Sequence, residues 1–381
     1  MNILFILGST REWMSGIWFH RNETPTTALK ARGHAVMQVP LDLLSQDNMK
    51  WCDVVIFGRT YHPNLQPKES MAAFKKLGKR VLYDMDDDFW NVASHNPSDL
   101  VSNAFKDQYE YFTKECDAFI TPSVYLGKRI QKIAKGKPVF LAPNGINYDL
   151  YKPRAGGNKK LVIGWMGAAS HWQDLLIPMD ALIELKKKHD FIFVLYGLTA
   201  EPIDSAMWVV QKLLQLNYEP AKREMHLVMM KFWDKLKQLE FGHLPFMIPE
   251  LHPLKLSQAN FDIAIAPLED NEFNRGKSNI KYYEYASVGS PTLASDVLPY
   301  NTEVSYLAKN TTKDWYNKLE KLIVDEKFRQ ELAQKQGDWV KKNRNCNDKD
   351  SPLGLDWEIA CQQNTKNLTL NQKGWFNIFK K

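Results

Sequence analysis

Short apolar runs that alternate with helix-like segments constrain this chain more than any other feature of its sequence. The first half contains six such runs, at residues 2–7, 34–39, 53–57, 80–83, 117–121 and 138–142. Their length is that of buried strands, and helix-like segments lie between most of them. The same alternation starts again at residues 161–166 and 191–196 and continues to a strand that begins at residue 262. Strands alternating with helices predict parallel, doubly wound sheets, here two of them.

A break in composition separates the two halves. Residues 152–158 read KPRAGGN, which is typical of a linker, and 381 residues are many for a single hydrophobic core. We expect a Rossmann-like domain at residues 1–152, a second at residues 160–345 and a tail or helix at residues 346–381. We also expect a helical insertion at residues 202–238, a charged helix at 313–336 and a last helix at 356–371.

Composition indicates a soluble protein with an anionic substrate. The net charge is +6, which is mildly basic and below what a dedicated nucleic-acid binder carries. Four scattered cysteines without metal-type spacing predict free thiols in a reducing compartment. The start, MNILFILGS, is too short and uncharged for a signal peptide, and no run approaches the roughly 18 apolar residues of a membrane helix. We therefore expect a cytoplasmic chain without a transmembrane segment.

The segment APLEDNEFNRGKSNIKYYEYASVGSPTLASD, residues 266–296, predicts a strand end, a polar loop and a helix that ends at Gly289. Ser278 or Asn279 is the expected N-cap, and the unpaired N–H groups of a helix N-terminus attract anions. Arg275 and Lys277 add positive charge beside it. We predict a pyrophosphate seat here, since open α/β sheets bind ligands at the carboxyl ends of their strands. An ordinary capped helix beside a basic loop is the alternative.

The acidic run DMDDD, residues 84–88, is the sharpest feature of the first half. Like charges at this density are costly unless they have partners. Three interpretations remain open: a Mg²⁺ or Mn²⁺ site, a solvated helix-capping run, and a role in orienting or deprotonating an acceptor, for which we choose Asp86 and Asp87. Arg59, at a nearby strand end, either adds charge across the site or pairs with Asp86 or Asp88.

Other candidate residues follow predicted strand ends. His171 comes after a small-residue loop, where it contacts a phosphate or sugar or is a satisfied loop histidine. Trp18 and Trp90 offer faces that stack on sugars or bases, with burial in the core as the alternative.

The insertion at residues 207–238 mixes Trp and Met with several Lys. Such a segment either contacts an anionic membrane peripherally, or contacts a nucleic-acid backbone, or is a solvated helix that packs its apolar face.

Several segments, in the same order over nearly the whole chain, resemble the GT-B glycosyltransferases of the retaining, family-4-like branch. The matching pieces are CDAFITPSVYLGKRI (116–130), VFLAPNGINYDLYKP (139–153), LVIGWMG (161–167) and NRGKSNIKYYEYASVGSPTLASD (274–296). The resemblance implies two Rossmann-like domains that face each other across a cleft, with the C-terminal helix crossing back to the first domain.

The resemblance also implies roles for residues. Glu284 would bind the ribose of a nucleoside-diphosphate sugar, and Lys277, Ser278 and the amides from Asn279 onward would hold its pyrophosphate. The loop from Gly167 to Ser170 would form the floor. Two further positions come from the first domain: Gly16 in a small-residue loop of the donor site, and His20 where acceptors sit.

One departure from the family pattern concerns the transferred sugar. The family has a second glutamate eight positions before Glu284, and this chain has Gly276 there. Sugar contacts must then come from elsewhere, with the candidates Glu269, Asp270, Glu272 and Asn274.

The resulting functional hypothesis is a retaining transferase that uses a UDP-sugar and requires no metal. Its acceptor would be a saccharide, usually a surface or lipid-linked one. The first alternative is glycosylation of a hydroxylated base in DNA, as some viral GT-B enzymes perform. The second is a non-catalytic nucleotide-sugar-binding protein, which the glycine at position 276 keeps open.

Overall fold

The computed structural model describes residues 1–8, 16–58, 67–93, 96, 106–168, 171–197, 219–245 and 247–362. Two candidate residues, Arg59 and Ser170, lie outside these ranges. The described chain forms two sheets of six strands each, and every strand pair in them is parallel. The expectation of two parallel, doubly wound sheets is confirmed.

The first sheet has the order β2-β1-β3-β4-β5-β6. Its strands are β1 (Asn2–Leu7), β2 (Ala35–Pro40), β3 (Val54–Phe57), β4 (Arg80–Asp84), β5 (Ala118–Thr121) and β6 (Val139–Leu141). The flanking helices are α1 (Gly16–Trp18), a π-helix (Phe19–Glu23), α2 (Thr24–Ala31), α3 (Gln46–Trp51), α4 (Pro67–Lys76), α6 (Lys106–Glu115) and α7 (Val124–Ile133).

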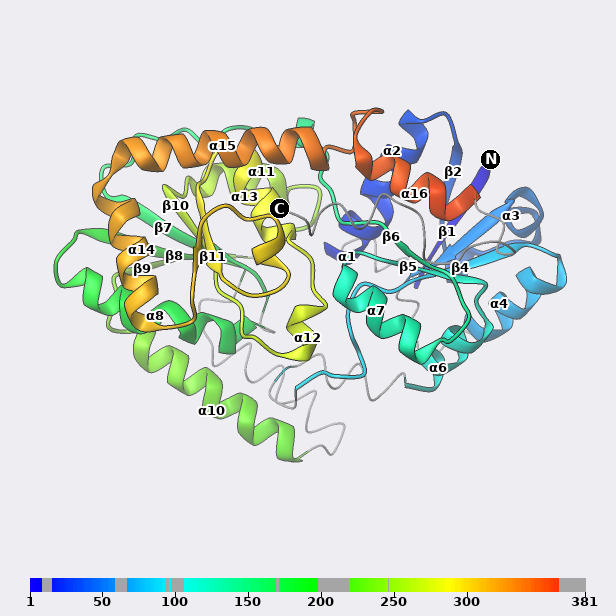
Figure 1. Cartoon of the computed structure of the whole chain (residues 1–381), viewed down its shortest axis with the longest axis horizontal. Coiled ribbons are helices and arrows are strands. Elements are labelled where there is room, and N and C mark those ends of the chain that lie inside the picture. Colours follow the sequence, from blue (N-terminus) through cyan, green and yellow to red (C-terminus); the bar gives the residue numbers. More distant parts are fainter. Residues whose placement is uncertain are drawn as a thin grey trace.

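The second sheet has the order β12-β11-β10-β7-β8-β9 and lies beside the first along the long axis of the molecule (Figure 1). Its strands are β7 (Leu161–Met166), β8 (Phe191–Tyr196), β9 (Phe241–Leu244), β10 (Ile263–Ala266), β11 (Thr292–Ser295) and β12 (Leu307–Ala308). Its helices are α8 (Trp172–Lys186), α10 (Glu219–Leu236), α11 (His252–Ala259), α12 (Glu272–Arg275), α13 (Ile280–Ser287), α14 (Thr312–Val324) and α15 (Glu326–Arg344).

Each sheet separates two hydrophobic cores, because successive side chains of a strand point to opposite faces. In β3, Val55 and Phe57 join one core, whereas Val54 and Ile56 join the other. The strand at residues 263–266 does the same with alternating Ile and Ala. Burial on both faces explains why these strands are continuous apolar runs in the sequence.

After α15 the chain returns to the first domain, where the last described helix, α16 (Pro352–Gln362), lies beside α2 (Figure 1). Its Trp357 is buried, with its ring centroid 5.8 Å from that of Phe5 in β1. Glu358 accepts hydrogen bonds from Arg32 Nε at 2.7 Å and from His34 Nε2 at 3.0 Å. The predicted return of the chain to the first domain is confirmed.

Three predicted helices have different bounds. The single helix expected at 313–336 is two, α14 and α15, because Asp325 interrupts it and caps α15 by accepting from Phe328 N at 2.9 Å. The last helix begins at Pro352 rather than residue 356, and its predicted end at 371 falls outside the described residues. In the insertion only α10, which projects from the second domain in Figure 1, is described.

The four cysteines are buried free thiols, as expected. No helix within the described ranges has both the length and the apolar character needed to cross a bilayer.

Candidate functional site

The strand order of the second sheet reverses between β7 and β10. From β7 the chain proceeds outward through β8 and β9, and β10 then returns to the opposite side of β7, followed by β11 and β12. Doubly wound sheets bind ligands at such a reversal, outside the carboxyl ends of the strands. The loop that follows β7 and the segment that joins β10 to α13 are therefore the first place to look for a ligand site.

Other atoms approach the backbone closely at the ends of β7 and β8, which explains the glycines at positions 167 and 197. A Cβ at Gly167 would lie 2.6 Å from the ring of Trp165. A Cβ at Gly197, whose φ is +104°, would lie 2.6 Å from the carbonyl oxygen of Gly167. Only glycine fits at either position, so the ends of β7 and β8 present bare backbone.

Glu284 on α13 is buried and receives three polar contacts at Oε1. The hydroxyl of Tyr151 donates to it at 3.0 Å, and Nε2 of His252 lies 2.9 Å away. Nε2 of His20, from the first domain, lies 3.4 Å away. Burial raises the pKa of the Glu284 carboxyl, but the two histidines outweigh burial and the net pKa lies below its ordinary value. Glu284 is thus a charged acceptor at the junction of the domains.

His20 lies on the π-helix between α1 and α2 rather than in a loop. The structure brings it to Glu284, a residue of the predicted donor site. Its predicted role toward an acceptor stays a prediction, but its one ion-pair contact among the described residues is with the second domain.

The residues before α13 form the turn that the sequence predicts as a pyrophosphate seat. Lys277 Nζ lies 4.5 Å from the ring centroid of Phe273 and 3.7 Å from Asp87 Oδ1 in the first domain. Ser278 Oγ accepts from Asn144 Nδ2 at 2.7 Å. Asn279 is the N-cap residue, as one of the two alternatives expected, although its side chain does not cap the helix.

Instead, the Asn279 amide donates to Glu303 Oε2 at 2.8 Å. The first-turn N–H groups of α13 are therefore not covered by the side chain of the N-cap residue, which leaves them to an external acceptor.

Arg275, also predicted to face the pyrophosphate, is engaged elsewhere. It makes a bidentate pair with Asp270, with Nε to Oδ1 at 2.6 Å and Nη2 to Oδ2 at 3.0 Å. This pairing raises the pKa of the guanidinium, and the side chain is exposed. Its charge is largely neutralised by Asp270, so Lys277 is the stronger candidate of the two.

The sequence interpretation missed two residues of this site, Lys281 and Asp174. Lys281 Nζ lies 3.0 Å from Nε2 of His171, whose Nδ1 lies 2.6 Å from Asp174 Oδ2. Burial, reinforced by the charge of Lys281, lowers the pKa of His171 to about 4. His171 is therefore neutral, and we assign its proton to Nδ1, which donates to Asp174, while Nε2 accepts from Lys281.

A signal for Lys281 was present in the sequence. It lies in the first turn of the predicted helix, four residues after Lys277, although Lys277 itself lies in the turn before α13. Asp174 lies three residues after His171, but its contacts with the turn are tertiary: Oδ1 accepts from the backbone N of Glu269 at 2.7 Å and from Asn274 Nδ2 at 3.3 Å.

The acidic run after β4 does not act as one unit. Asp84 is buried and forms a bidentate pair with the equally buried Arg21, whose Nε donates to Oδ2 at 2.9 Å. Asp88 is buried too, and burial raises the pKa of its carboxyl. It accepts from Asn91 Nδ2 at 2.7 Å and lies 3.5 Å from Arg129 Nε.

Asp87 forms an ion pair with Lys277 of the second domain, with Oδ1 3.7 Å from Nζ. Asp86 lies within the described residues, and its role in orienting or deprotonating an acceptor stays a prediction. Within the described ranges, no group of three or more His, Cys, Asp or Glu side chains is arranged to hold a metal ion.

The two domains meet at the position where the family pattern has a glutamate. Ser123 Oγ, at the start of α7, donates to the carbonyl of Gly276 at 2.7 Å. A Cβ at Gly276 would lie 3.5 Å from Cβ of Asp88. The first domain thus abuts the turn at residue 276. Two of the alternative candidates for sugar contacts already have surroundings within the protein. Asn274 is buried, and the exposed Glu272 lies 4.0 Å from Arg129 of the first domain.

The remaining candidates lie apart from this turn. Trp18 Nε1 donates to Gln38 Oε1 at 2.7 Å beside β2 and lines a surface pocket there. Trp90 is partly buried against the core of the first domain. Gly16 is exposed, with nothing within 4 Å of a Cβ built on it.

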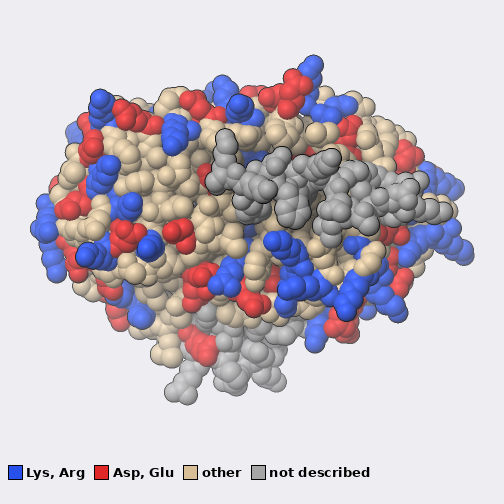
Figure 2. All heavy atoms as spheres, viewed as in Figure 1, with Lys and Arg blue, Asp and Glu red and all other residues tan. Residues whose placement is uncertain are grey.

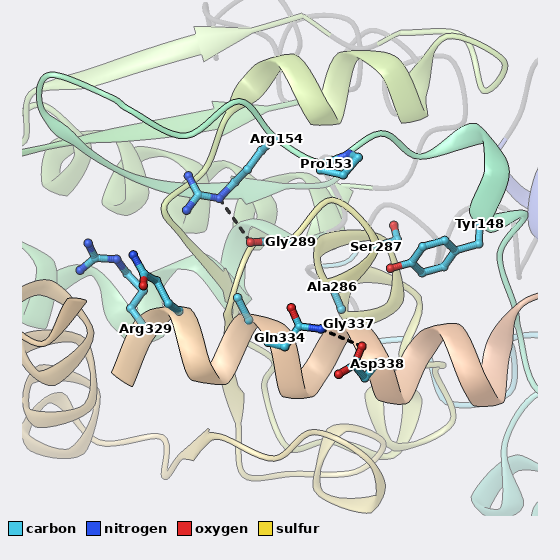
Figure 3. Close-up of a pocket in the computed structure, with 12 residues that line it drawn as sticks. Tyr148, Pro153, Arg154, Ala286, Ser287, Gly289, Arg329, Gln334, Gly337 and Asp338 are labelled. Carbon is cyan, nitrogen blue, oxygen red and sulfur yellow. Dashed lines mark hydrogen bonds between the residues drawn. The ribbon is translucent and has the colours of Figure 1, made fainter. Parts of the chain in front are cut away.

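A pocket of about 330 Å³ lies at the other end of α13 (Figure 3). It is lined by the interdomain segment around Tyr148 and Arg154, by the end of α13 and by α15. Arg154 Nε donates to the Gly289 carbonyl at 3.3 Å, so its charge is directed at protein atoms. No predicted site residue lines this pocket, and the β7–β10 reversal is a better ligand site on chemical grounds.

Comparisons with known proteins agree with this architecture. A glycosyltransferase from Rickettsia africae matches with a TM-score of 0.58 and 15% identity over 94% of this chain and 96% of that one. Anabaena HepE, in complex with UDP and glucose, matches with a TM-score of 0.58 and 13% identity over 94% of this chain and 98% of that one.

An α-glucosyltransferase, in complex with UDP and a 13-mer DNA containing an HMU base, matches with a TM-score of 0.61 and 13% identity over 91% of this chain and 96% of that one. No family model and no curated protein matches the sequence. Identities this low show the fold alone: the chain has the GT-B fold of these glycosyltransferases.

Proposed function

We propose that the chain is a glycosyltransferase that moves a sugar from a UDP-sugar to an acceptor hydroxyl, with retention of configuration and without a required metal. The observation that carries this proposal is the convergence of Lys277, Lys281 and Glu284 at the β7–β10 reversal. A carboxylate suited to sugar hydroxyls and cations suited to a diphosphate lie there on one short helix region.

The reaction divides the work between the domains. The bond from the anomeric carbon to the β-phosphate oxygen breaks, and its electron pair leaves with UDP. A new bond forms from the same carbon to the acceptor oxygen, and the acceptor proton passes to a base. Lys277 and the first-turn amides of α13 would neutralise the leaving diphosphate as its charge grows. Asp87, 3.7 Å from Lys277, is our candidate to orient or deprotonate the acceptor.

Glu284 would accept hydrogen bonds from the ribose. Its low pKa keeps it ionised, and an ionised carboxylate only accepts. The histidines that now contact it, His20 and His252, would hold it in place or yield to the ribose.

Binding of UDP tests the proposal. We expect Lys277→Met and Glu284→Gln each to weaken UDP binding about tenfold to hundredfold, since charge-assisted hydrogen bonds contribute about 1.5–3 kcal/mol. Isothermal titration measures this, with Lys313→Met on the exposed side of α14 as the matched control. UDP release from a panel of UDP-sugars, with and without acceptors, then separates an enzyme from a binding protein. Unchanged UDP binding in both variants would refute the proposed site.

A second candidate acceptor is DNA with a hydroxylated base, and one observation favours it. The chain has no acidic residue between Asp117 and Asp149, and α7 within this span exposes Lys128, Lys132 and, just after its end, Lys135. This helix begins at Ser123, which touches the turn at Gly276. The α-glucosyltransferase of similar fold was solved with DNA.

Figure 2 tempers this candidate, because Lys and Arg alternate with Asp and Glu over most of the described surface in view. A saccharide acceptor therefore stays the first proposal. Duplex binding that weakens steeply with salt in the wild type, and less steeply in a variant with Lys128, Lys132 and Lys135 changed to Gln, would favour DNA.

A further inference from the structure

Lys281 is a partly buried lysine without a carboxylate partner. Among the described residues it has no ion pair, and its one hydrogen bond goes to the neutral ring of His171 at 3.0 Å. Removing an ammonium group from water without a counter-charge is costly. An ammonium has three N–H donors, so two remain for something other than His171.

Lys281 lies at the predicted diphosphate-binding site. Its Cε lies 3.3 Å from the position of a Cβ on Gly167, so the side chain rests against the bare backbone at the end of β7. Lys277, in the turn before α13, repels it electrostatically. Lys277 has an ion pair with Asp87 at 3.7 Å, whereas Lys281 has none among the described residues. A diphosphate bound at this strand-order reversal would supply the further negative charge.

His171 and Asp174 hold Lys281 in place. Asp174 fixes the imidazole through Nδ1 at 2.6 Å, and its other oxygen ties the segment at Glu269 to α8. The fixed tautomer presents a lone pair on Nε2 to the ammonium. A neutral acceptor orients Lys281 without consuming its positive charge, which an aspartate at the same place would do.

We propose that Lys281 is a catalytic residue that contacts the diphosphate of the donor, and that His171 and Asp174 are its positioning residues. This inference rests on the proposed function and deepens it, because it assigns the second phosphate cation. The loop after β7 contributes no cation, because residues 167–174 contain no Lys or Arg. The second positive charge for the diphosphate would therefore come from Lys281 on α13.

The pH dependence of UDP affinity gives this proposal a readout of its own. Burial, together with the charge of Lys277, lowers the pKa of Lys281 to about 8. The groups that face Lys281 are His171, Asp174, Lys277, Glu284 and, from the first domain, Asp87. Lys281 is charged below pH 8 and loses its proton above it, so UDP affinity should fall as the pH rises from 7 to 9.

The experiment is titration of UDP at pH 7, 8 and 9 against the full chain and four variants. Lys281→Met should bind UDP about tenfold more weakly at pH 7 and should lose the fall near pH 8. Lys281→Arg should restore affinity at pH 7 and stay flat to pH 9, because arginine remains charged. The control Lys313→Met should behave as the wild type.

The variant His171→Phe tests whether His171 orients Lys281 or only stabilises the fold. Without the acceptor at Nε2 the charged form of Lys281 is less stable, so the fall in affinity should move to lower pH. Thermal unfolding of each variant shows whether it is folded. UDP binding by Lys281→Met with wild-type affinity and the same fall near pH 8 would overturn this proposal alone. Failure of the wild type to bind UDP at any pH would instead overturn the proposed function, and this proposal with it.

Discussion

The acidic run after β4 and the basic turn before α13 look alike in the sequence, but they serve different purposes in the fold. Both are dense in charge, and both follow the carboxyl end of a buried strand. The acids separate, with Asp84 against Arg21, Asp88 against Arg129 and Asp87 facing Lys277. The basic residues Lys277 and Lys281 converge with Glu284 on one helix region.

The difference lies in where the partners come from. Asp84 and Asp88 find cations within the first domain, and these contacts stabilise it. Lys277 and Lys281 stand at the strand-order reversal, where their one ion pair among the described residues is that of Lys277 with Asp87. Charge density alone therefore does not identify a site, and cations with few carboxylate partners at a topological switch point are the stronger indication.

The largest expected effect is on the structural side of this comparison. Arg21→Met removes one partner of a buried ion pair and leaves Asp84 uncompensated, so the free energy of unfolding should fall by about 3–5 kcal/mol. Urea denaturation measures it. The control is Arg275→Met, which breaks the exposed pair with Asp270 and should cost less than about 1 kcal/mol. Equal effects in the two variants would mean that the first pair is not structural.

Asp87, the member of the run that we propose acts on the acceptor, should behave in the opposite way. We expect Asp87→Asn to leave stability nearly unchanged and to lower kcat about 10²–10⁴-fold, as loss of a general base does. UDP affinity should hold or rise slightly, because Lys277 loses a competing carboxylate. Steady-state kinetics with a UDP-sugar measures both. A change confined to donor KM would place Asp87 with the donor residues instead of the acceptor.

A glycine substitution sharpens the comparison on the donor side. A Cβ at Gly167 would meet the ring of Trp165 at 2.6 Å, so Gly167→Ala should destabilise the chain by about 1–3 kcal/mol and weaken UDP binding by moving the loop. Gly16→Ala meets nothing within 4 Å and should change neither quantity much. Thermal unfolding with and without UDP tests both. A Gly167→Ala variant as stable as Gly16→Ala would show that the loop is free to move.

The smallest effect concerns the contact between the two regions. Ser123 caps α7 by accepting from Leu126 N and also donates to the Gly276 carbonyl. Ser45 caps α3, and within the described chain the hydrogen bonds of its side chain are both with Asn48 of the same helix. Each serine-to-alanine change should cost about 1 kcal/mol as a lost cap, and Ser123→Ala should cost about 0.5–1.5 kcal/mol more. Chemical denaturation of both variants gives the difference, and equal values would show that the bond to Gly276 contributes nothing.

Much of the fold was predictable because the central strands are buried on both faces. The alternation of Ile263 to Ala266 between two cores leaves a continuous apolar run that periodicity detects. The break at Asp325 was missed because a single aspartate serves equally well within a solvated helix and as a cap between two.

The candidate site was predictable only where it is local. Lys277, Ser278 and Glu284 share one segment with a helix start, so their grouping follows from sequence spacing. The contact of His20 with Glu284 and those of Asp174 with Glu269 and Asn274 join residues more than 90 positions apart, and no spacing rule predicts them. Asp84 was grouped with Asp87 because the sequence does not show that Arg21 lies beside it in the fold.

The central claim is that a UDP-sugar binds at the β7–β10 reversal with its diphosphate against the start of α13. A crystal structure of the chain with UDP tests this most directly. We predict phosphate oxygens within hydrogen-bond distance of Lys277 Nζ and of the first-turn amides of α13, with the ribose at Glu284. UDP bound elsewhere, for example in the pocket between α13 and α15 shown in Figure 3, would contradict the claim.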